Sequence, residues 1–209
     1  MVVISHSKMF IFIHAPKTAG NSIQNILKKY SDDTILEKNG SRRQGSVLSK
    51  FEVENFAGNK HSPISSYIGR WNDNFASFES FFKFGVVRNP WSRMISFYFH
   101  INPQPDHIFD RDLFINIVEG NIGSKMQLKS FRHHYFHRGK LMMDKVLRFE
   151  NLQNDFNEAC KLIGIPVEEL PHVNKSQHRD LRQYYDDELV AKVGEIYASD
   201  IEKFDYCFD

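Results

Sequence analysis

Short apolar segments alternate along this chain with stretches in which apolar residues recur every three or four positions. An unbroken apolar run at residues 9–13 predicts a buried strand, and the largely apolar segments 83–87 and 145–149 predict a second and a third strand. Strands that alternate with helical stretches predict an α/β fold, in which a parallel β-sheet is flanked by helices.

A helical stretch follows each predicted strand. The first has an apolar stripe of helical period. The second begins with Asn89 as a favourable N-cap and Pro90 as the first helical residue. The third covers residues 152–163, and Gly164 is its predicted C-terminal stop. Further helices are predicted at residues 75–82, 110–119 and 186–204, the last as one helix or two.

Two segments give no clear element. Residues 31–60 are polar, contain three glycines and are predicted to be mostly loop, with short helical pieces left open. Residues 124–140 are basic and ambiguous, and a helix is one interpretation. The length of 209 residues is enough for a sizeable core, so we expect a single domain over residues 1–209.

The loop between the first strand and its helix, residues 14–20, is the first candidate site and is called the Lys17 loop below. Helix N-termini offer unpaired N–H groups and a partial positive charge, so such a loop can bind phosphate. Gly20 allows close backbone approach and positive φ. Ser22 can donate a hydroxyl, and Lys17 adds a full charge. The alternative is a tight turn shaped by Pro16 and Gly20, with Lys17 in solvent.

The phosphate loop of kinases, G-x-x-x-x-G-K-[ST], is absent, because Asn21 occupies the position of its lysine. Such loops work with an acidic metal ligand at the end of another strand, whereas the second strand here ends in Arg88. The third strand is followed by Glu150. Ligands of parallel sheets bind at the carboxyl ends of strands, so the Lys17 loop and Arg88 together indicate a ligand with two phosphate-like groups. Arg88 could equally be an ion-pair partner within the fold.

Two motifs resemble a known family. The stretches "APKTAGNS" (residues 15–22) and "VVRNPWSRMISFY" (residues 86–98) resemble the sulfotransferases that use 3′-phosphoadenosine 5′-phosphosulfate (PAPS), and they are most similar to the branch that acts on carbohydrates. The stretches "RFENL" and "YYDDELVAKVGEIYASDIEKFDY" are similar to the C-terminal portion of that family. The resemblance covers most of the chain and implies a P-loop-like sulfotransferase fold.

The resemblance also implies the residues of the site. By this match, Arg88 and Ser96 would hold the 3′-phosphate of the donor, and Lys17 would in addition stabilise the charge that builds on the departing phosphate. The sulfuryl group is singly charged and needs less neutralisation than a phosphoryl group, so PAPS is expected without a metal. The residues expected to hold the phosphosulfate are Lys17, Thr18, Ala19, Gly20, Asn21 and Ser22.

The acceptor hydroxyl needs a base. His61, in "NKHSPISSYIG", is the preferred candidate, because relatives of this branch often carry a histidine at the corresponding place and a neutral imidazole suits proton transfer near neutral pH. The alternative is a structural or exposed histidine, since the chain has ten. His14 is the second candidate and is expected to order the turn, and Glu79 is the third. Further residues expected near the nucleotide or acceptor, by similarity of their segments, are Gln127, Asn174, Ser176 and Arg179.

Charge is unevenly distributed along the chain, although the net charge is only +1. Residues 125–145 carry six Lys/Arg, one acidic residue and three histidines, whereas residues 186–209 carry eight acidic residues and two lysines. The basic segment predicts an electropositive surface for an anionic ligand, or a solvated face. His133 and His137 lie four positions apart, but no nearby Cys or acidic residue completes a zinc set, so no metal site is expected.

Cysteine usage and hydropathy indicate the compartment. Cys160 and Cys207 are far apart, and Cys160 lies on the apolar side of a predicted helix, which favours a buried free thiol over a disulfide. No stretch approaches the roughly 18 apolar residues of a membrane span, and no signal peptide is evident. A cytoplasmic location is therefore expected.

The predicted function is transfer of a sulfuryl group from PAPS to an acceptor hydroxyl, on a carbohydrate, by in-line displacement. One rival hypothesis is a nucleotide kinase with a variant phosphate loop. The other is a nucleotide- or glycan-binding module without catalysis. No nucleic-acid partner is expected, whereas the sequence leaves the identity of the acceptor and a homo-oligomer open.

Overall fold

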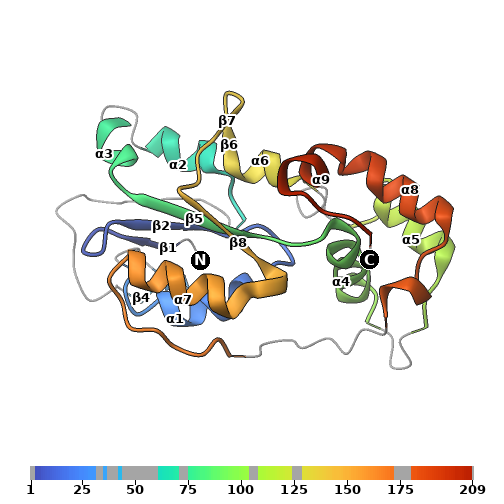
Figure 1. The fold of residues 1–209 in the computed structure, drawn as a ribbon, viewed down its shortest axis with the longest axis horizontal. Helices are drawn as coiled ribbons and strands as arrows, with labels where there is room; N and C mark the ends of the chain where they lie inside the picture. Colours follow the sequence, from blue (N-terminus) through green and yellow to red (C-terminus); the bar gives the residue numbers. More distant parts are fainter. Residues whose placement is uncertain are drawn as a thin grey trace.

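The computed structural model describes residues 3–31, 35–36, 42–43, 61–70, 75–103, 108–123, 129–171 and 180–208. Within these ranges, the central sheet has four strands in the order β1–β2–β5–β8 (Figure 1). The three strands predicted from the sequence are confirmed as β2, β5 and β8. The bounds are Val3–Ser5 for β1, Phe10–Ile13 for β2, Phe82–Val87 for β5 and Lys145–Arg148 for β8.

The strands β2, β5 and β8 run parallel, as predicted, and β1 is an unpredicted strand that pairs antiparallel with β2. Ile13 pairs with Gly85, and Val87 pairs with Arg148. The three parallel strands therefore end at one edge of the sheet. The loops that follow them begin side by side at that edge, which is where ligands of such sheets bind.

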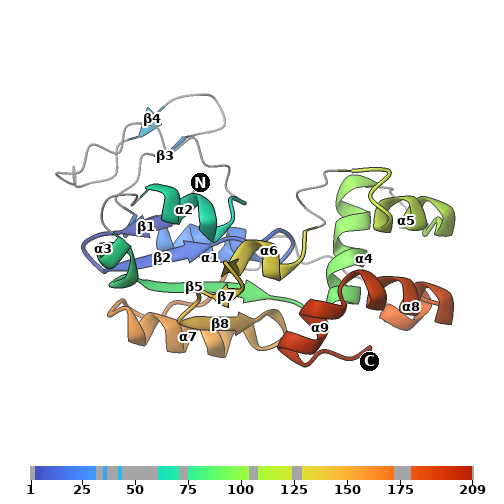
Figure 2. The ribbon, with the colours of Figure 1, turned by 90° about the horizontal axis from the view of Figure 1, so that it is seen from above.

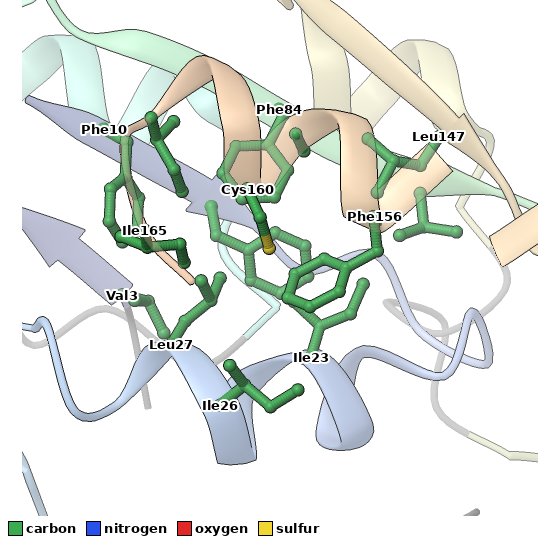
Figure 3. Close-up of a cluster of buried hydrophobic side chains, with 14 of the residues drawn as sticks. Val3, Phe10, Ile23, Ile26, Leu27, Phe84, Leu147, Phe156, Cys160 and Ile165 are labelled. Carbon is green, nitrogen blue, oxygen red and sulfur yellow. The ribbon is translucent and has the colours of Figure 1, made fainter. Parts of the chain in front are cut away.

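Two helices, α1 (Gly20–Leu27) and α7 (Leu152–Leu162), cover one face of the sheet (Figure 1). Figure 3 shows their apolar side chains meeting those of the strands, with Phe156 and Cys160 from α7 among them. Cys160 is a buried free thiol, as predicted. Gly164 has a φ of 66°, the left-handed conformation of a helix C-terminal stop, which confirms its predicted role.

The other face of the sheet is covered by α2 (Ile64–Arg70), α3 (Phe75–Glu79) and α6 (Phe131–Tyr135) (Figure 1). Side chains alternate between the two faces: Ile11 and Ile13 of β2 join the cluster on this side, whereas Phe10 and Phe12 join the cluster under α1 and α7. Helix α2 was not predicted. Helix α3 confirms the helix predicted at residues 75–82, but it is shorter than predicted.

The two segments without a clear prediction contain short strands. In the described part of residues 124–140, helix α6 is followed by a hairpin of β6 (Phe136–His137) and β7 (Lys140–Leu141), so only part of this segment is helical. In the segment 31–60, β3 (Ile35–Leu36) pairs antiparallel with β4 (Arg42–Arg43), where short helical pieces had been left open.

Beyond the sheet edge, four helices pack around a separate apolar cluster (Figure 2). They are α4 (Pro90–Ile101), α5 (Arg111–Val118), α8 (Asp187–Ile196) and α9 (Ala198–Phe204). Asn89 caps α4 as predicted, because its side chain accepts hydrogen bonds from the N–H groups of Trp91 and Ser92. The segment 186–204 forms two helices. Short 3₁₀ turns lie at η1 (Phe149–Asn151) and η2 (Leu181–Gln183).

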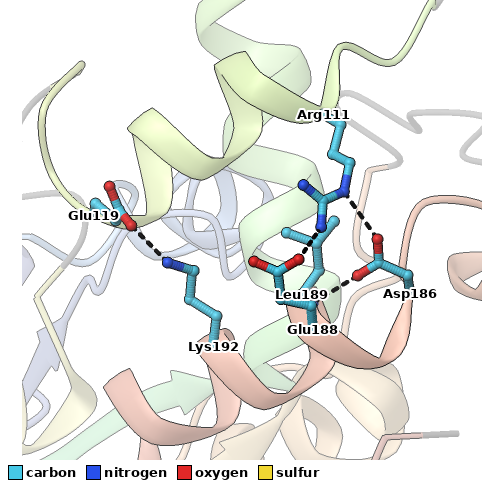
Figure 4. A network of polar contacts seen from close by, with 6 residues as sticks. All are labelled: Arg111, Glu119, Asp186, Glu188, Leu189 and Lys192. Carbon is cyan, nitrogen blue, oxygen red and sulfur yellow. Dashed lines mark hydrogen bonds and ion pairs between the residues drawn. The ribbon is translucent and has the colours of Figure 1, made fainter.

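Ion pairs join α5 to α8 on the surface of this helical part (Figure 4). Arg111 contacts Asp186 at 2.9 Å and Glu188 at 2.5 Å, and Lys192 contacts Glu119 at 2.5 Å. Water and salt screen such exposed pairs, so they orient the helices more than they stabilise them. No helix among the described residues is both long and apolar enough to cross a bilayer. The fold is mixed α/β with a mostly parallel central sheet flanked by helices, as predicted.

Candidate functional site

The Lys17 loop has a backbone conformation that residues with a Cβ rarely adopt. Lys17 has a φ of 65° and Ala19 has a φ of 58°, both in the left-handed region. This region costs roughly 1–2 kcal/mol for each such residue. Within the loop, the Thr18 hydroxyl donates to the carbonyl oxygen of Ala15 at 2.8 Å. Strain of this kind persists only where surrounding contacts hold it, and it is concentrated at functional sites.

Helix α1 begins directly after the loop, so its N-terminus lies where the sequence predicts an anion-binding one. Its N-cap residue is Ala19, whose side chain cannot cap the first turn with a hydrogen bond. Ser22 is buried, and Asn21 is exposed. A helix N-terminus without a side-chain cap is suited to an anionic group, because its partial positive charge is left for the ligand.

Gly20 is required for a reason that differs from the predicted one. The residues of the Lys17 loop with positive φ are Lys17 and Ala19, and Gly20 itself lies in α1, so the expectation of positive φ at Gly20 is wrong. A Cβ at Gly20 would lie 2.1 Å from Cδ2 and Nε2 of the His14 ring. Gly20 therefore lets the buried His14 ring pack against the start of α1.

His61 lies against the beginning of the same loop. Its Nδ1 is 3.0 Å from the backbone oxygen of His14, and the two rings meet edge to face with centroids 4.6 Å apart. A carbonyl oxygen can only accept, so Nδ1 carries the proton in this bond. In the neutral ring the basic lone pair is then on Nε2, which is the tautomer that a general base needs.

Arg88, at the end of β5, contacts the Lys17 loop directly. Its Nη1 donates to the backbone oxygen of Lys17 at 3.2 Å, while Nε and Nη2 donate to Oγ of Ser92 at 2.9 and 2.8 Å. The guanidinium lies 4.0 Å from the centroid of the Phe149 ring. Burial lowers the pKa of Arg88 to about 10, so the group remains charged at neutral pH. These bonds use three of its five N–H donors, and two take no part in the bonds to described residues.

The turn that carries Arg88 is fixed by residues from distant parts of the chain. The backbone N–H of Asn89 donates to Oε1 of Glu150 at 2.8 Å, and its side-chain amide donates to the carbonyl oxygen of Cys207 at 2.8 Å. The Tyr206 hydroxyl donates to Oε2 of Glu150 at 3.2 Å. The C-terminal residues thus hold the end of β5, a role for which the sequence contains no local signal.

The family model described as "Sulfotransferase family" matches residues 1–207, which is nearly the whole chain. The chain belongs to the sulfotransferase family. Comparison with curated proteins and with solved structures finds no match. Membership supports a transferase, and members of the family generally take PAPS as donor and a hydroxyl as acceptor.

The structure brings together most of the residues that the sequence resemblance assigns to the site. The Lys17 loop, Arg88 and His61 are joined by direct hydrogen bonds or ring contacts. Ser96 lies on α4, one turn beyond Ser92, and the guanidinium of Arg88 bonds to Ser92. Ser92 was not assigned to the site from the sequence.

The other candidate bases differ in position. Glu79 ends α3, which precedes β5, whereas Arg88 follows the opposite end of that strand. Six residues of strand span roughly 20 Å, which places Glu79 away from the loop and removes it as a candidate base. His14 is buried under Gly20, in agreement with the expectation that it orders the turn.

The histidines of the basic segment do not all lie on a charged surface. His134 is fully buried. Burial, with a smaller contribution from Arg93, lowers the pKa of His134 well below its usual value. Within the described residues, no group of three His, Cys, Asp or Glu side chains is placed to hold a metal ion. The residues expected near the ligand that lie outside the described ranges are Gln127, Asn174, Ser176 and Arg179.

Replacing Gly20 with alanine is expected to destabilise this sulfotransferase by about 1–3 kcal/mol, the usual cost of overpacking. The new methyl group would displace the His14 ring, and with it the His61 contact. Urea unfolding measures the change. Gly69→Ala is the matched control, because a Cβ at Gly69 meets nothing within 4 Å and alanine favours helix α2. Equal stabilities of the two variants would contradict the proposed packing.

Proposed function

We propose that the protein transfers the sulfuryl group of PAPS to a hydroxyl of a carbohydrate, with the donor held between the Lys17 loop and Arg88. The observation that carries the proposal is the hydrogen bond from Arg88 to the backbone oxygen of Lys17. It joins a charged group at the end of β5 to a strained loop at the start of α1. Two anion-binding elements on neighbouring strands suit a ligand with two separated phosphate-like groups.

Donor binding follows from the chemistry of each element. The phosphosulfate would lie at the N-terminus of α1, with residues Lys17 to Ser22 around it. The 3′-phosphate would be bound by the remaining donors of Arg88 and by Ser96. Because the Arg88 guanidinium is almost wholly buried, its charge is poorly screened by water, and its attraction for a phosphate is correspondingly strong.

The proposed reaction is a single in-line displacement. His61 takes the proton of the acceptor hydroxyl on Nε2, and the acceptor oxygen forms a bond to sulfur. The bond between sulfur and the bridging oxygen breaks, and that oxygen leaves as part of the 5′-phosphate. Lys17 stabilises the charge that develops on the leaving phosphate. The His14 carbonyl keeps the His61 ring in the required tautomer.

The carbohydrate acceptor rests on the two sequence motifs, which are most similar to the branch that sulfates sugars. A cytoplasmic location and a single domain remain predictions alongside it.

The hydrogen bonds of Glu150 argue against the kinase hypothesis. This residue follows β8 and is the acidic group that such an enzyme would use to hold a metal ion. Both carboxylate oxygens already accept hydrogen bonds, one from the Asn89 N–H and the other from the Tyr206 hydroxyl. Glu150 is therefore assigned a structural role at the turn that carries Arg88.

Thermal unfolding with the desulfated donor, 3′-phosphoadenosine 5′-phosphate (PAP), tests the donor site. In EDTA, PAP at about 100 times its dissociation constant is expected to stabilise the protein by about 2.7 kcal/mol. For a chain of this size that raises the melting temperature by roughly 5–10 °C. ADP with magnesium is expected to give no comparable rise.

Arg88→Met is expected to remove most of the rise, because hydrogen bonds from a charged group contribute about 1.5–3 kcal/mol. Arg111→Met is the matched control, since Arg111 lies on the surface of α5 and forms only exposed ion pairs. Stabilisation by ADP with magnesium but not by PAP would favour the kinase hypothesis. PAP binding without transfer to any carbohydrate would favour the binding module.

A further inference from the structure

Arg93, in the first turns of α4, is the most deeply buried cation among the described residues. Only 2% of its surface is exposed, and among the described residues it has the largest of the fully buried side chains. Figure 2 shows α4 starting at the end of β5, with α6 and α9 close by. A guanidinium in such a place is costly unless its charge and donors are used, so its contacts indicate its role.

The contacts of Arg93 reach two segments far apart in the sequence. Its Nε donates to the backbone oxygen of Pro16 at 3.1 Å, and its Nη2 donates to the backbone oxygen of Lys129 at 2.9 Å. The guanidinium lies 4.5 Å from the centroid of the Phe131 ring and 5.8 Å from that of Tyr197. Arg93 therefore connects the Lys17 loop to the segment that enters α6.

A buried carboxylate accompanies this charge. Asp200 is 1% exposed and accepts hydrogen bonds from the N–H groups of Phe131 at 2.7 Å and Arg132 at 3.2 Å. Burial raises the pKa of Asp200, while these bonds and the charge of Arg93 oppose that rise. Arg93 and Asp200 thus hold the same segment, one through its carbonyl and the other through its N–H groups.

The Pro16 contact has a specific effect on the next residue. The Pro16 oxygen and the Lys17 N–H belong to one planar peptide group, so fixing the oxygen also fixes the direction of that N–H. Arg88 binds the Lys17 oxygen and fixes the following peptide group in the same way. The two dihedrals of Lys17 are the only soft rotations between these planes. Hydrogen bonds from two arginines therefore act on the peptide groups on either side of Lys17.

We propose that Arg93 is a positioning residue that, together with Arg88, locks Lys17 in its left-handed conformation and so aims its ammonium group at the 5′-phosphosulfate. The left-handed backbone costs roughly 1–2 kcal/mol for a residue with a Cβ, which one hydrogen bond from a charged group can offset. The identity of the ligand rests on the proposed function. The effect of Arg93 on the Lys17 backbone does not depend on that function.

The binding test compares two nucleotides. Arg93→Met removes the bond to Pro16 and is expected to weaken PAP binding by about 10–100-fold, as measured by calorimetry. Binding of adenosine 3′-monophosphate, which lacks the 5′-phosphate, should change by less than about two-fold, because it does not use the Lys17 loop. A purely structural role of Arg93 would weaken both nucleotides equally, and that result would overturn the proposal.

Two further variants complete the test. Arg93→Lys keeps the charge beside Asp200 but has a single donor centre for two carbonyls. Its affinity for PAP should therefore lie between those of the wild type and Arg93→Met. If Arg93→Met does not fold, Arg93→Lys is compared with the wild type instead. Arg111→Met is the matched control, because Arg111 lies on the surface of α5 and pairs there with Asp186 and Glu188. It should bind both nucleotides like the wild type.

A crystal structure of the Arg93 variant separates this inference from the proposed function. Lys17 is expected to relax to negative φ once its preceding peptide group is released. An unchanged φ at Lys17 would overturn the inference whatever nucleotide the protein binds. Failure of the wild type to bind PAP would instead overturn the proposed function.

Discussion

Replacing Lys17 with methionine is expected to lower kcat for sulfuryl transfer by about 10²–10³-fold, the usual effect of removing one group that stabilises developing charge. Methionine keeps an unbranched side chain of similar length and removes only the ammonium group, so the fold should be retained. The charge on the leaving phosphate would then develop without its nearest cation. The rate is measured as conversion of PAPS to PAP, with the most active member of a carbohydrate panel as acceptor.

Lys28→Met is the matched control for this experiment. Lys28 is exposed at the C-terminal end of α1, at the opposite end of the helix from the Lys17 loop. Its replacement removes the same charge at the other end of α1 and should leave kcat unchanged. A Lys17→Met variant with the wild-type rate would show that the leaving group is stabilised elsewhere, and the assignment of the Lys17 loop to the phosphosulfate would fail.

Strands β2 and β5 could be predicted from the sequence because they are buried on both faces. The residues of β2 are all buried, with alternate side chains entering different clusters, so the strand appears as an unbroken apolar run. The start of α4 could also be predicted, because Asn89 and Pro90 act through local backbone chemistry. In both cases the information lies within a few consecutive residues.

The missed elements depend on contacts between distant residues. Strand β1 has three residues and β6 and β7 have two each, too few for any period to be visible. Each is a strand only because a partner strand lies beside it. Contacts at the site are equally hard to predict from local patterns. The hydrogen bond from Asn89 to Cys207 joins residues 118 positions apart, and no local pattern predicts it.

The Lys17 loop shows how an unusual turn can be located from the sequence with an incorrect reason for its glycine. A glycine beside a phosphate loop indicates positive φ, but the strained residues are Lys17 and Ala19, and Gly20 instead makes room for His14. Residues with a Cβ adopt such conformations only when tertiary contacts hold them. Those contacts come from Arg88 and Arg93, 71 and 77 positions away from the loop residues they bind.

His61→Asn is expected to lower kcat by about 10²–10⁴-fold, the range for loss of a general base, while the dissociation constant for PAP stays near that of the wild type. The amide nitrogen of asparagine can take the place of Nδ1 and keep the bond to the His14 carbonyl. The basic Nε2 is lost. The variant therefore removes the base and leaves the loop contact in place, which separates catalysis from packing.

His100→Asn is the control, because His100 is exposed near the far end of α4. Both variants are compared by turnover with a carbohydrate acceptor and by PAP binding. If His61→Asn lost PAP binding together with turnover, the histidine would be a support of the Lys17 loop and not the base. If it retained both, the proton of the acceptor would have to leave by another group, and the edge-to-face contact of His61 with His14 would be structural alone.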